Sequence, residues 1–584
     1  LAAAGRGVGP GVGVGVVPVV RPAAGLGVGL VPRAVLGLGI GLVGGLAAGL
    51  GGGPAMAELR GPKLGAASNF GQSWQPEAVA AGADIGILRF RDEVIWNHVE
   101  QADGTLAFGS PRESYPRVLA GRGAAMTLLG YTGHPAHEGG RAPRTPGGQA
   151  AFASYHARIL RAFPLIDAIE VGNEYNAHAF ASTQGWPGDM AARARVYVDL
   201  LARTAAAARA ERPGITVLGG AAHSVPVAWA GAVMAAGGGA HMDAFVLHPY
   251  TTAPEQFRRQ VAVLRRVPGL ADMPLAVTEF GTKDATAAPG YLVRYYCQMA
   301  LAGVTRADWY PFSPRGDGLV PLVGADGAIT ATGAAWALIL ARLEGRPVRE
   351  VAPDAFTYAC RFGEDTLVIW GAPRAVTLGP DHVVLDALGR PVAAPLLLDR
   401  ADPLVIIGPD PRLGGGVRLG PQRVLADSFD QFPQEGGPDV FVRRAGAALP
   451  LVPRPGQEAD GVPWTPYLGF DDDGSLRVGA GWARPSAWGP DDPLEIVYRY
   501  TAPAHLLVDV EIGAAPSEAS EDGVTLALER DGRELTRRLL TRPDRLGARA
   551  VPLRAGQVLD IVLGPNRNAT GDHTDLRITM RRAE

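Results

Sequence analysis

From residue 61 to about residue 345, short apolar runs alternate with Ala-rich amphipathic stretches, and this alternation constrains the fold more than any other feature. Such alternation is typical of a parallel β-sheet whose strands are connected by helices. Eight strand–helix units in about 250 residues or slightly more predict a closed (β/α)8 TIM barrel. The predicted strands are Lys63–Ala67, Ile85–Phe90, Ala124–Gly130, Ile166–Val171, Ile215–Gly220, Ala244–His248, Leu275–Thr278 and Ala307–Pro311.

Two of these strands lead directly into a glutamate. Ile166–Val171 is followed by Gly-Asn and then Glu174, and Leu275–Thr278 is followed by Glu279. An unpaired carboxylate beside a buried strand is costly, so packing alone does not explain it. Functional residues of a TIM barrel lie at the C-terminal ends of its strands. The sequence therefore predicts a site with two carboxylates, and the alternative is a pair of structural carboxylates bound to arginines.

Aromatic and polar residues follow the other strand ends. Aromatic rings offer stacking surface to the C–H faces of sugars, and a few polar groups fix orientation, so the set predicts a carbohydrate site. Its members are Arg89, Arg91, Asp92 and Trp96 after the second strand, Tyr131 and His134 after the third, Asn173 after the fourth, His223 after the fifth, His248 and Tyr250 after the sixth, and Trp309 and Tyr310 after the eighth.

Several of these residues also have a structural interpretation. Arg89 can instead form a salt bridge with Asp92 or Glu93. Trp96 is expected to pack in the core. Packing is an equal alternative for Tyr131, Trp186, His223 and His248.

His134, His137 and Glu138 have a spacing that suggests a metal site. Their Pro- and Gly-rich surroundings indicate a loop, and no third ligand stands at zinc-like spacing. We therefore expect neither a metal nor a catalytic cofactor.

On these residues, the barrel resembles glycoside hydrolases of clan A, most closely family 39 and its bacterial exopolysaccharide-hydrolase relatives. Asn173-Glu174 after the fourth strand and a lone Glu279 after the seventh match the pattern of the clan. The stretch Arg89-x-x-Asp92-x-x-x-Trp96 resembles the segment after the second strand of family members. The resemblance covers about half of the chain.

The resemblance implies a retaining reaction in which Glu174 is the acid/base and Glu279 the nucleophile. An arginine beside Glu279 would keep it ionised, whereas an apolar, Asn-flanked Glu174 would hold its proton, as this chemistry requires. The resemblance also implies that Asn173 bonds the sugar 2-hydroxyl, that Arg89 and Tyr250 hold Glu279, and that His248 and Trp309 line the subsite beside the scissile bond. His134 is a further substrate-binding candidate from its position after the third strand.

The N-terminal segment has the composition of a targeting signal. Residues 1–54 are nearly all Gly, Ala, Val, Leu and Pro, and the apolar stretch Ala34–Leu50 leads to Ala55-Met56-Ala57. A cationic flank, an apolar core and an Ala-x-Ala box predict a secretory signal peptide, with an uncleaved membrane anchor as the alternative. We expect a mature protein that begins near Glu58 and is secreted or lies in the periplasm or cell envelope.

Charge and cysteine content exclude other classes. The formal net charge is −3 and no cluster of basic residues is visible, which argues against a nucleic-acid partner. Cys297 and Cys360 are the two cysteines, so there is neither a disulfide framework nor a Cys-rich metal site. We expect two buried free thiols rather than one bridge between domains.

After residue 345, short β runs separated by turns replace the helical pattern. These runs predict a small β-sandwich over residues 346–410, after the leader of residues 1–57 and the barrel of residues 58–345. Residues 411–584 are predicted to form a jelly-roll-like β-sandwich of the kind found among carbohydrate-binding modules. Because both glutamates lie in the barrel, we expect this last region to be dispensable for chemistry.

Two features of the last region have alternative interpretations. The segment Asp471–Gly474 is typical of a turn, and a calcium site there or at Asp572 and Asp575 is the alternative. The aromatic residues are expected in the core, with a sugar-stacking platform as the alternative. They are Trp464, Tyr467, Trp482 and Trp488.

The sequence thus predicts an exported retaining glycoside hydrolase that cleaves a polysaccharide, with bacterial exopolysaccharide as the expected substrate. An exo-acting β-glycosidase or a transglycosylase is the alternative within the same chemistry. A non-catalytic polysaccharide-binding or assembly protein is the alternative from another class. The presence of both Glu174 and Glu279 favours an enzyme, because a binding protein has no need of two carboxylates.

Overall fold

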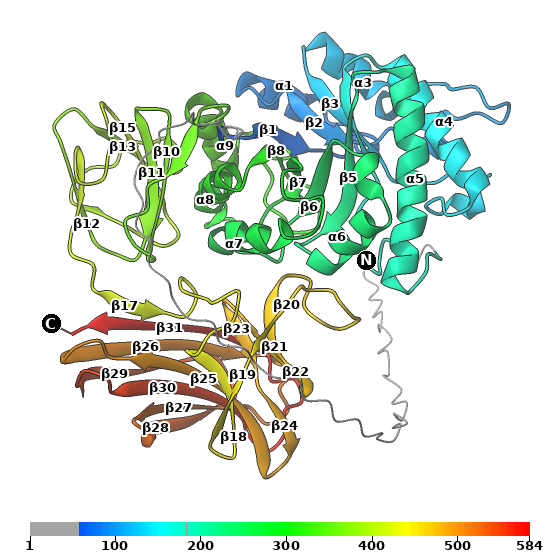
Figure 1. Cartoon of the computed structure of the whole chain (residues 1–584). Helices are drawn as coiled ribbons and strands as arrows, with labels where there is room; N and C mark the ends of the chain where they lie inside the picture. The colour runs from blue at the N-terminus through cyan, green and yellow to red at the C-terminus, as the bar shows by residue number, and fades with distance from the viewer. Residues whose placement is uncertain (1–57, 182–184, 584) are drawn as a thin grey trace, which may run out of the picture. The chain divides into compact units, whose positions relative to one another are not determined.

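The computed structural model describes residues 58–181 and 185–583 (Figure 1). The predicted signal peptide or anchor within residues 1–57 lies outside this range. No helix in the described part of the chain is long and apolar enough to cross a membrane.

Eight parallel strands close into a barrel in sequence order, β1 to β8, which confirms the predicted TIM barrel (Figure 1). The strands are β1 (Lys63–Ala67), β2 (Arg89–Asp92), β3 (Ala125–Gly130), β4 (Ile166–Val171), β5 (Thr216–His223), β6 (Ala244–His248), β7 (Leu275–Phe280) and β8 (Val304–Trp309). The helices in this part are α1 (Pro76–Asp84), α2 (Trp96–Val99), α3 (Pro111–Gly121), α4 (Pro146–Ala162), α5 (Met190–Glu211), α6 (Val227–Ala235), α7 (Pro254–Leu264), α8 (Ala288–Leu301) and α9 (Ala331–Arg342), with single 3-10 turns η1 (Glu138–Gly140) and η3 (Gly238–Ala240).

The second strand begins later than the sequence pattern predicts. Ile85 is the C-cap of α1 rather than a strand residue, and Gly86 follows with a φ of 84°. This left-handed glycine ends the helix and turns the chain, so that β2 runs only from Arg89 to Asp92. The shift decides which arginine of β2 reaches the top of the barrel.

The barrel interior has an apolar layer below a polar one. Ala168, Val246 and Ala276 belong to a small cluster of buried aliphatic residues. Successive side chains alternate between the two faces of a strand, so the residues two positions further along β4, β6 and β7 face the same way. Those residues are polar and buried: Glu170, His248 and Thr278. The alternation of side chains along these strands therefore places the polar residues of the site directly above the apolar layer.

A five-stranded and a three-stranded sheet form the predicted small β-sandwich after α9, around a core of aliphatic residues. Because β16 pairs with β12, this sandwich extends to residue 419 rather than 410. Its strands are β9 (Val348–Glu350), β10 (Thr357–Phe362), β11 (Thr366–Gly371), β12 (Ala375–Leu378), β13 (Val383–Leu385), β14 (Leu396–Leu397), β15 (Leu404–Ile407) and β16 (Val417–Leu419).

A disulfide joins the barrel to this sandwich. Cys297 lies on α8 and Cys360 on β10, both fully buried, with their Cα atoms 6.1 Å apart. The predicted free thiols are therefore wrong. The sequence pattern placed the cysteines in separate domains, but α8 packs beside the first strands of the sandwich, which brings the two side chains together.

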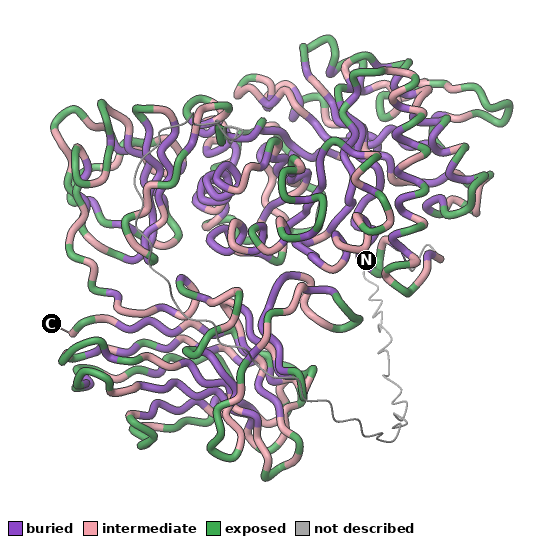
Figure 2. Tube along the Cα trace, in the orientation of Figure 1, coloured by how far each residue is buried: buried purple, intermediate pink, exposed green. Residues whose placement is uncertain are grey.

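The C-terminal region is a second, larger β-sandwich with its own apolar core between two antiparallel sheets. Figure 2 shows buried residues along its inner strands and exposed residues at its turns. The first sheet contains β17 (Val424–Asp427), β20 (Val452–Arg454), β21 (Tyr467–Phe470), β22 (Asp473–Gly479), β23 (Trp482–Arg484), β26 (Leu506–Pro516), β29 (Asp544–Leu553) and β31 (Thr574–Arg582). The second contains β18 (Val440–Arg444), β19 (Ala447–Pro450), β24 (Ser486–Gly489), β25 (Asp492–Thr501), β27 (Val524–Arg530), β28 (Arg533–Leu540) and β30 (Val558–Pro565).

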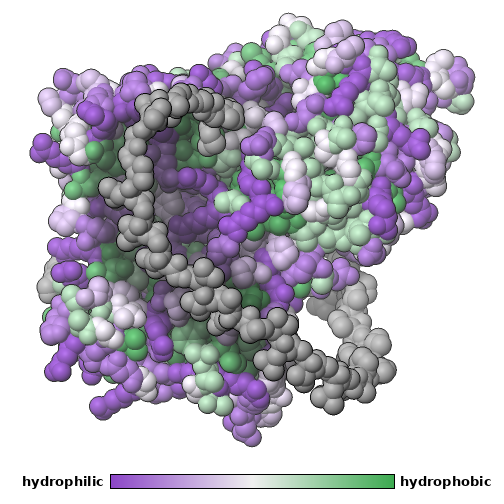
Figure 3. Space-filling view, viewed as in Figure 1, coloured by the Kyte–Doolittle hydropathy of each residue, from purple (hydrophilic) through white to green (hydrophobic). Residues whose placement is uncertain are grey.

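The surface carries mixed side chains. On the face shown in Figure 3, hydrophilic residues dominate the outer edges, and hydrophobic residues lie interspersed among them.

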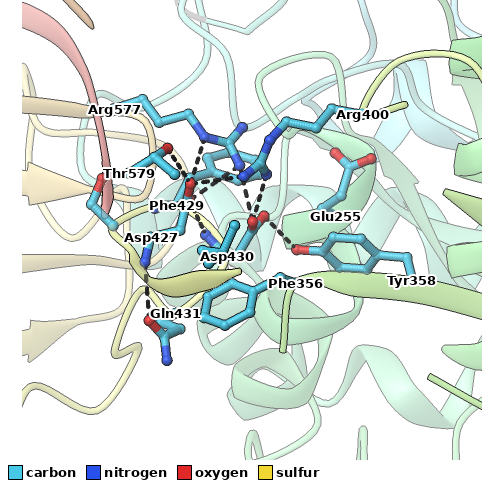
Figure 4. Close-up of polar contacts among 12 residues, drawn as sticks. Glu255, Phe356, Tyr358, Arg400, Asp427, Phe429, Asp430, Gln431, Arg577 and Thr579 are labelled. Carbon is cyan, nitrogen blue, oxygen red and sulfur yellow. Dashed lines mark hydrogen bonds and ion pairs between the residues drawn. The ribbon is translucent and has the colours of Figure 1, made fainter. Parts of the chain in front are cut away.

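A buried ionic cluster connects the two sandwiches (Figure 4). Asp427 and Asp430 follow from β17, and each binds both Arg400 of the small sandwich and Arg577 of β31 at 2.5 to 3.1 Å. The hydroxyl of Tyr358 on β10 also donates to Asp430 at 3.1 Å. Charges that are buried together in this way fix relative positions, because separating them leaves an unpaired charge.

We expect Asp427→Ala to lower the free energy of unfolding by about 3 kcal/mol, because it leaves two half-buried arginines with one carboxylate. Urea denaturation of the variant measures the loss. Asp491→Ala, at an exposed position of the same region, is the matched control and should change stability by less than about 0.5 kcal/mol. Equal stability of the two variants would contradict a structural role for the cluster.

Candidate active site

A pocket of about 540 Å³ opens at the C-terminal ends of the barrel strands. It contains both predicted glutamates, Glu174 and Glu279, together with aromatic, amide and cationic side chains. Its other lining residues include Ser68, Asn69, Arg91, Asp92, Glu93, Tyr131, Asn173, Phe180, His223, Tyr250, Lys283, Tyr310, Arg315 and Leu319.

The backbone around Glu174 is held in an unusual conformation. Glu174 has a φ of 50°, and Ala221 on the neighbouring β5 and Ser224, directly after β5, have φ values of 44° and 66°. Left-handed conformations are uncommon for residues other than glycine and cost of order 1 kcal/mol or more. A hydrogen bond from the Tyr175 N–H to the Ala221 carbonyl ties the two segments together. The strain is concentrated where Glu174 meets the end of β5.

Two histidines bind the carboxylate of Glu174. Its Oε1 lies 2.8 Å from Nδ1 of His223 and 2.9 Å from Nδ1 of His248. Burial would raise the pKa of Glu174, but these hydrogen bonds and the charge of His248 lower it below its ordinary value. The prediction that Glu174 has apolar surroundings is therefore wrong. The local sequence could not show this, because the two histidines come from other strands.

His248 stores a proton beside Glu174. Burial alone would lower the pKa of His248, but the nearby carboxylates of Glu279, Glu170 and Glu174 raise it to about 9. Its Nε2 lies 2.9 Å from the hydroxyl of Thr278. At neutral pH, the pair of Glu174 and His248 therefore carries one proton that can move to the carboxylate.

Glu279 has a different set of partners. Its Oε1 accepts a hydrogen bond from the guanidinium of Arg91, and its Oε2 accepts one from the Tyr250 hydroxyl at 2.9 Å. Arg91 also binds Glu170 through two nitrogens, at 2.7 and 2.8 Å, and donates to Oδ1 of Asn173 at 2.9 Å. Arg91 thus orients the nucleophile candidate and the Asn-Glu segment together.

The two carboxylates lie close to each other. An oxygen of Glu174, an oxygen of Glu279 and a nitrogen of His248 all lie within 4.8 Å of one another, and the described residues contain no other such cluster of possible metal ligands. Both ring nitrogens of His248 already have protein partners, Glu174 at Nδ1 and Thr278 at Nε2.

Arg89 does not lie where the sequence predicted. Because β2 begins at Arg89, this residue is two positions nearer the bottom of the barrel than Arg91, on the same face of the strand. Its charge acts on Glu344, and Arg91 makes the contact with Glu279 that we predicted for Arg89. Asp92, the other predicted partner of Arg89, instead accepts hydrogen bonds from Ser68 and Phe70.

Asn173 and Tyr250 line the pocket as predicted, but three other predicted residues do not line it. Trp309 is fully buried and donates from Nε1 to the Val320 carbonyl at 2.9 Å. His134 lies in the loop between β3 and α4 with its ring tilted against that of Trp96, and Trp96 itself is buried as expected. His248 is fully buried behind Glu174 and acts on the site through that carboxylate.

Sequence reasoning passed over Glu170 and Gln457. Strand β4 carries two acidic residues, and Glu170 lies on the buried face of the strand whereas Asp167 is exposed, so a charge on the apolar face was a usable signal. Gln457 had no such signal, because it lies 281 residues from its partner Asn176.

The C-terminal sandwich reaches the rim of the site. In the loop between β20 and β21, the Gln457 side chain exchanges two hydrogen bonds of 2.8 Å with Asn176. In the same loop, the ring of Trp464 packs edge-on against His223, with 5.1 Å between centroids. We therefore expect a truncation after residue 411 to alter the site, in contrast to the prediction from the sequence.

No protein-family model matches the sequence, and no curated protein matches it significantly. The structure is similar to a family 39 glycoside hydrolase from the gut symbiont Bacteroides cellulosilyticus WH2, with 17% identity, a TM-score of 0.49, and coverage of 59% of this chain and 81% of that one. It is also similar to a family 39 β-xylosidase from Caulobacter crescentus, with 17% identity, a TM-score of 0.45, and coverage of 61% and 98%. A family 30 endoxylanase from Clostridium papyrosolvens C71 has 13% identity, a TM-score of 0.44, and coverage of 60% and 97%. The function is therefore argued from the residues of the site alone.

Proposed function

We propose that this protein is a retaining glycoside hydrolase in which Glu279 is the nucleophile and Glu174 the general acid/base. The observation that carries the proposal is the pair of carboxylates in one pocket, with an oxygen of each within 4.8 Å of the other and with different partners. Retaining enzymes hold their carboxyl groups about 5 to 5.5 Å apart, whereas inverting enzymes need about 6.5 to 9.5 Å to admit a water.

In the first step, an oxygen of Glu279 attacks the anomeric carbon, and the bond to the leaving oxygen breaks. Arg91 and Tyr250 each donate a hydrogen bond to the carboxylate of Glu279 and so fix its direction. Glu174 receives a proton from His248 and passes it to the leaving oxygen, so that Glu174 is an unprotonated carboxylate when the second step begins. Two negative charges this close repel each other, and the repulsion grows when substrate displaces the water between them. Binding of substrate therefore favours the protonated form of Glu174.

In the second step, Glu279 is esterified and neutral. Its loss of charge lowers the proton affinity of Glu174, which then accepts a proton from water as the water attacks the anomeric carbon. Two inversions return the configuration of the substrate. Asn173, held by Arg91, is placed to bind a hydroxyl of the sugar beside the scissile bond.

The substrate we propose is a polysaccharide, and bacterial exopolysaccharide is the candidate. The composition of residues 1–57 supports export to the cell envelope or medium, where such a polymer is found. Tyr131 and Phe180 supply apolar surface in the pocket for sugar rings.

A panel of aryl α- and β-glycosides tests the reaction class. We expect hydrolysis of at least one member, with the first-formed sugar showing the anomeric configuration of its substrate in a proton NMR time course. Added methanol should yield a methyl glycoside of the same configuration. A first product of inverted configuration would contradict the double displacement, and no turnover of any glycoside or polysaccharide would favour a binding protein.

A further inference from the structure

A second cavity of about 530 Å³ adjoins the catalytic pocket, and His223 lines both. Its other walls come from Thr251 of the barrel, from the loop between β20 and β21, from β22 and β23, and from the residue before β31. We call this cavity the interdomain groove. The two cavities are therefore neighbours, with the side chain of His223 common to both linings.

Aromatic rings form part of the interdomain groove. Trp464 and Trp482 both line it and remain partly exposed. Trp482 lies against His573, with 5.1 Å between ring centroids. Two of the four aromatic residues that the sequence suggested for sugar stacking are thus brought into one cavity. The other two are elsewhere, since Tyr467 is buried and Trp488 lies under Arg444.

The same groove contains cations without counter-ions. Arg477 donates to the carbonyls of Gly461 and Gly474, and Arg484 has a buried Nε without a hydrogen-bond partner. Neither arginine forms an ion pair with any residue that the structure describes. Other buried or half-buried arginines, such as Arg91, Arg294 and Arg400, do form ion pairs.

The nearest acidic groups form no ion pair with these arginines. Asp572 accepts a hydrogen bond from Ser520, and burial raises its pKa to about 6, although the charge of Arg484 opposes that rise. Asp575 is mostly exposed and lies 3.7 Å from the ring of His573. In the catalytic pocket, Lys283 and Arg315 are two more cations that form no ion pair within the described ranges. Both the catalytic pocket and the interdomain groove therefore contain positively charged side chains.

We propose that the interdomain groove is a subsite for a carboxylate-bearing sugar, so that the substrate is an anionic polysaccharide. A guanidinium binds a carboxylate through two parallel hydrogen bonds, and an indole stacks on a sugar ring, so Arg484 and Trp482 together fit a uronic acid residue. The inference rests on the proposed function, since it assumes that a glycan occupies the catalytic pocket. It goes beyond that function because it names the charge of the substrate and the site that binds the charged group.

Binding measurements on the full chain carrying Glu279→Gln test the proposal without consuming the ligand. The probes are oligosaccharides of alginate, hyaluronan and polygalacturonate, each compared with its carboxyl-reduced form by isothermal titration calorimetry. We expect at least one acidic probe to bind at least about tenfold more tightly than its reduced form. The preference should fall as salt is raised.

Substitutions in the groove locate the preference. Arg484→Gln and Arg477→Gln should each reduce the ratio of acidic to reduced binding to less than about threefold, whereas Arg484→Lys should keep part of it. Arg533→Gln, an exposed position on the other sheet of the sandwich, makes the same change in net charge and should keep the full ratio. Trp482→Leu should weaken acidic and reduced probes alike.

Equal binding of all three acidic probes and their reduced forms would overturn the proposal. So would a ratio that survives both arginine substitutions. Failure of the proposed function is read separately, from turnover of neutral aryl glycosides and its dependence on Glu279, so the two outcomes can be told apart.

Discussion

Glu279→Gln is expected to lower kcat/KM for an activated aryl glycoside by at least about 10⁴-fold, because it removes the nucleophile of the first step. The amide keeps the size of the side chain and can still accept from Tyr250, so the loss reports chemistry rather than shape. Turnover of a dinitrophenyl glycoside measures it.

Glu518→Gln is the matched control, because this exposed glutamate lies in the C-terminal sandwich. It should leave kcat/KM within about twofold of the parent enzyme, because substitutions at exposed positions away from the site have small effects. Thermal unfolding of the Glu279→Gln variant should show a single transition near that of the parent. Substantial activity of a folded Glu279→Gln protein would mean that another group attacks the sugar.

Glu174→Ala is expected to have an effect that depends on the leaving group. A phenolate with a low pKa departs without a proton, so formation of the glycosyl-enzyme from a dinitrophenyl glycoside should be nearly preserved. A poor leaving group should lose about 10² to 10⁴-fold in rate, the usual worth of general acid catalysis. Measurement of kcat/KM across a series of substituted phenyl glycosides gives a steeper dependence on phenol pKa in the variant.

Azide supplies the complementary test of Glu174. The variant lacks the base that activates water, and a small anion can enter the space left by the side chain and attack without one. We expect azide to raise kcat for the dinitrophenyl substrate and to yield a glycosyl azide of the substrate's own configuration. His223→Ala, which removes one partner of Glu174 but leaves the carboxylate, should not respond to azide. Rescue of neither variant would show that Glu174 is not the base.

Much of the fold follows from local patterns in the sequence. All eight barrel strands were predicted, because each apolar run buries its side chains on both faces of a parallel sheet. The boundary of β2 was not, because the apolar pair Ile85 and Ile87 continues the strand pattern across the end of α1. The partner of Glu279 that the resemblance implied, Arg89, is also wrong, because Arg91 makes that contact.

The two glutamates were predicted because their strands end in recognisable strings, but their electrostatic environment was not. The histidines beside Glu174 come from β5 and β6, and only the closed barrel brings them together. The same holds for the disulfide, whose cysteines are 63 positions apart, and for the groove, which joins barrel residues to residues of the C-terminal sandwich. Contacts of this kind depend on how domains pack, and no local pattern encodes them.

The most direct test of the proposed mechanism is to trap the glycosyl-enzyme. The full chain is incubated with dinitrophenyl 2-deoxy-2-fluoroglycosides of the sugar that the aryl glycoside panel identifies, digested with protease and analysed by mass spectrometry. We predict one added fluorosugar on the peptide that contains Glu279, and none in the Glu279→Gln variant. A fluorosugar on any other carboxylate, or an unlabelled enzyme that still hydrolyses the parent glycoside, would contradict the account.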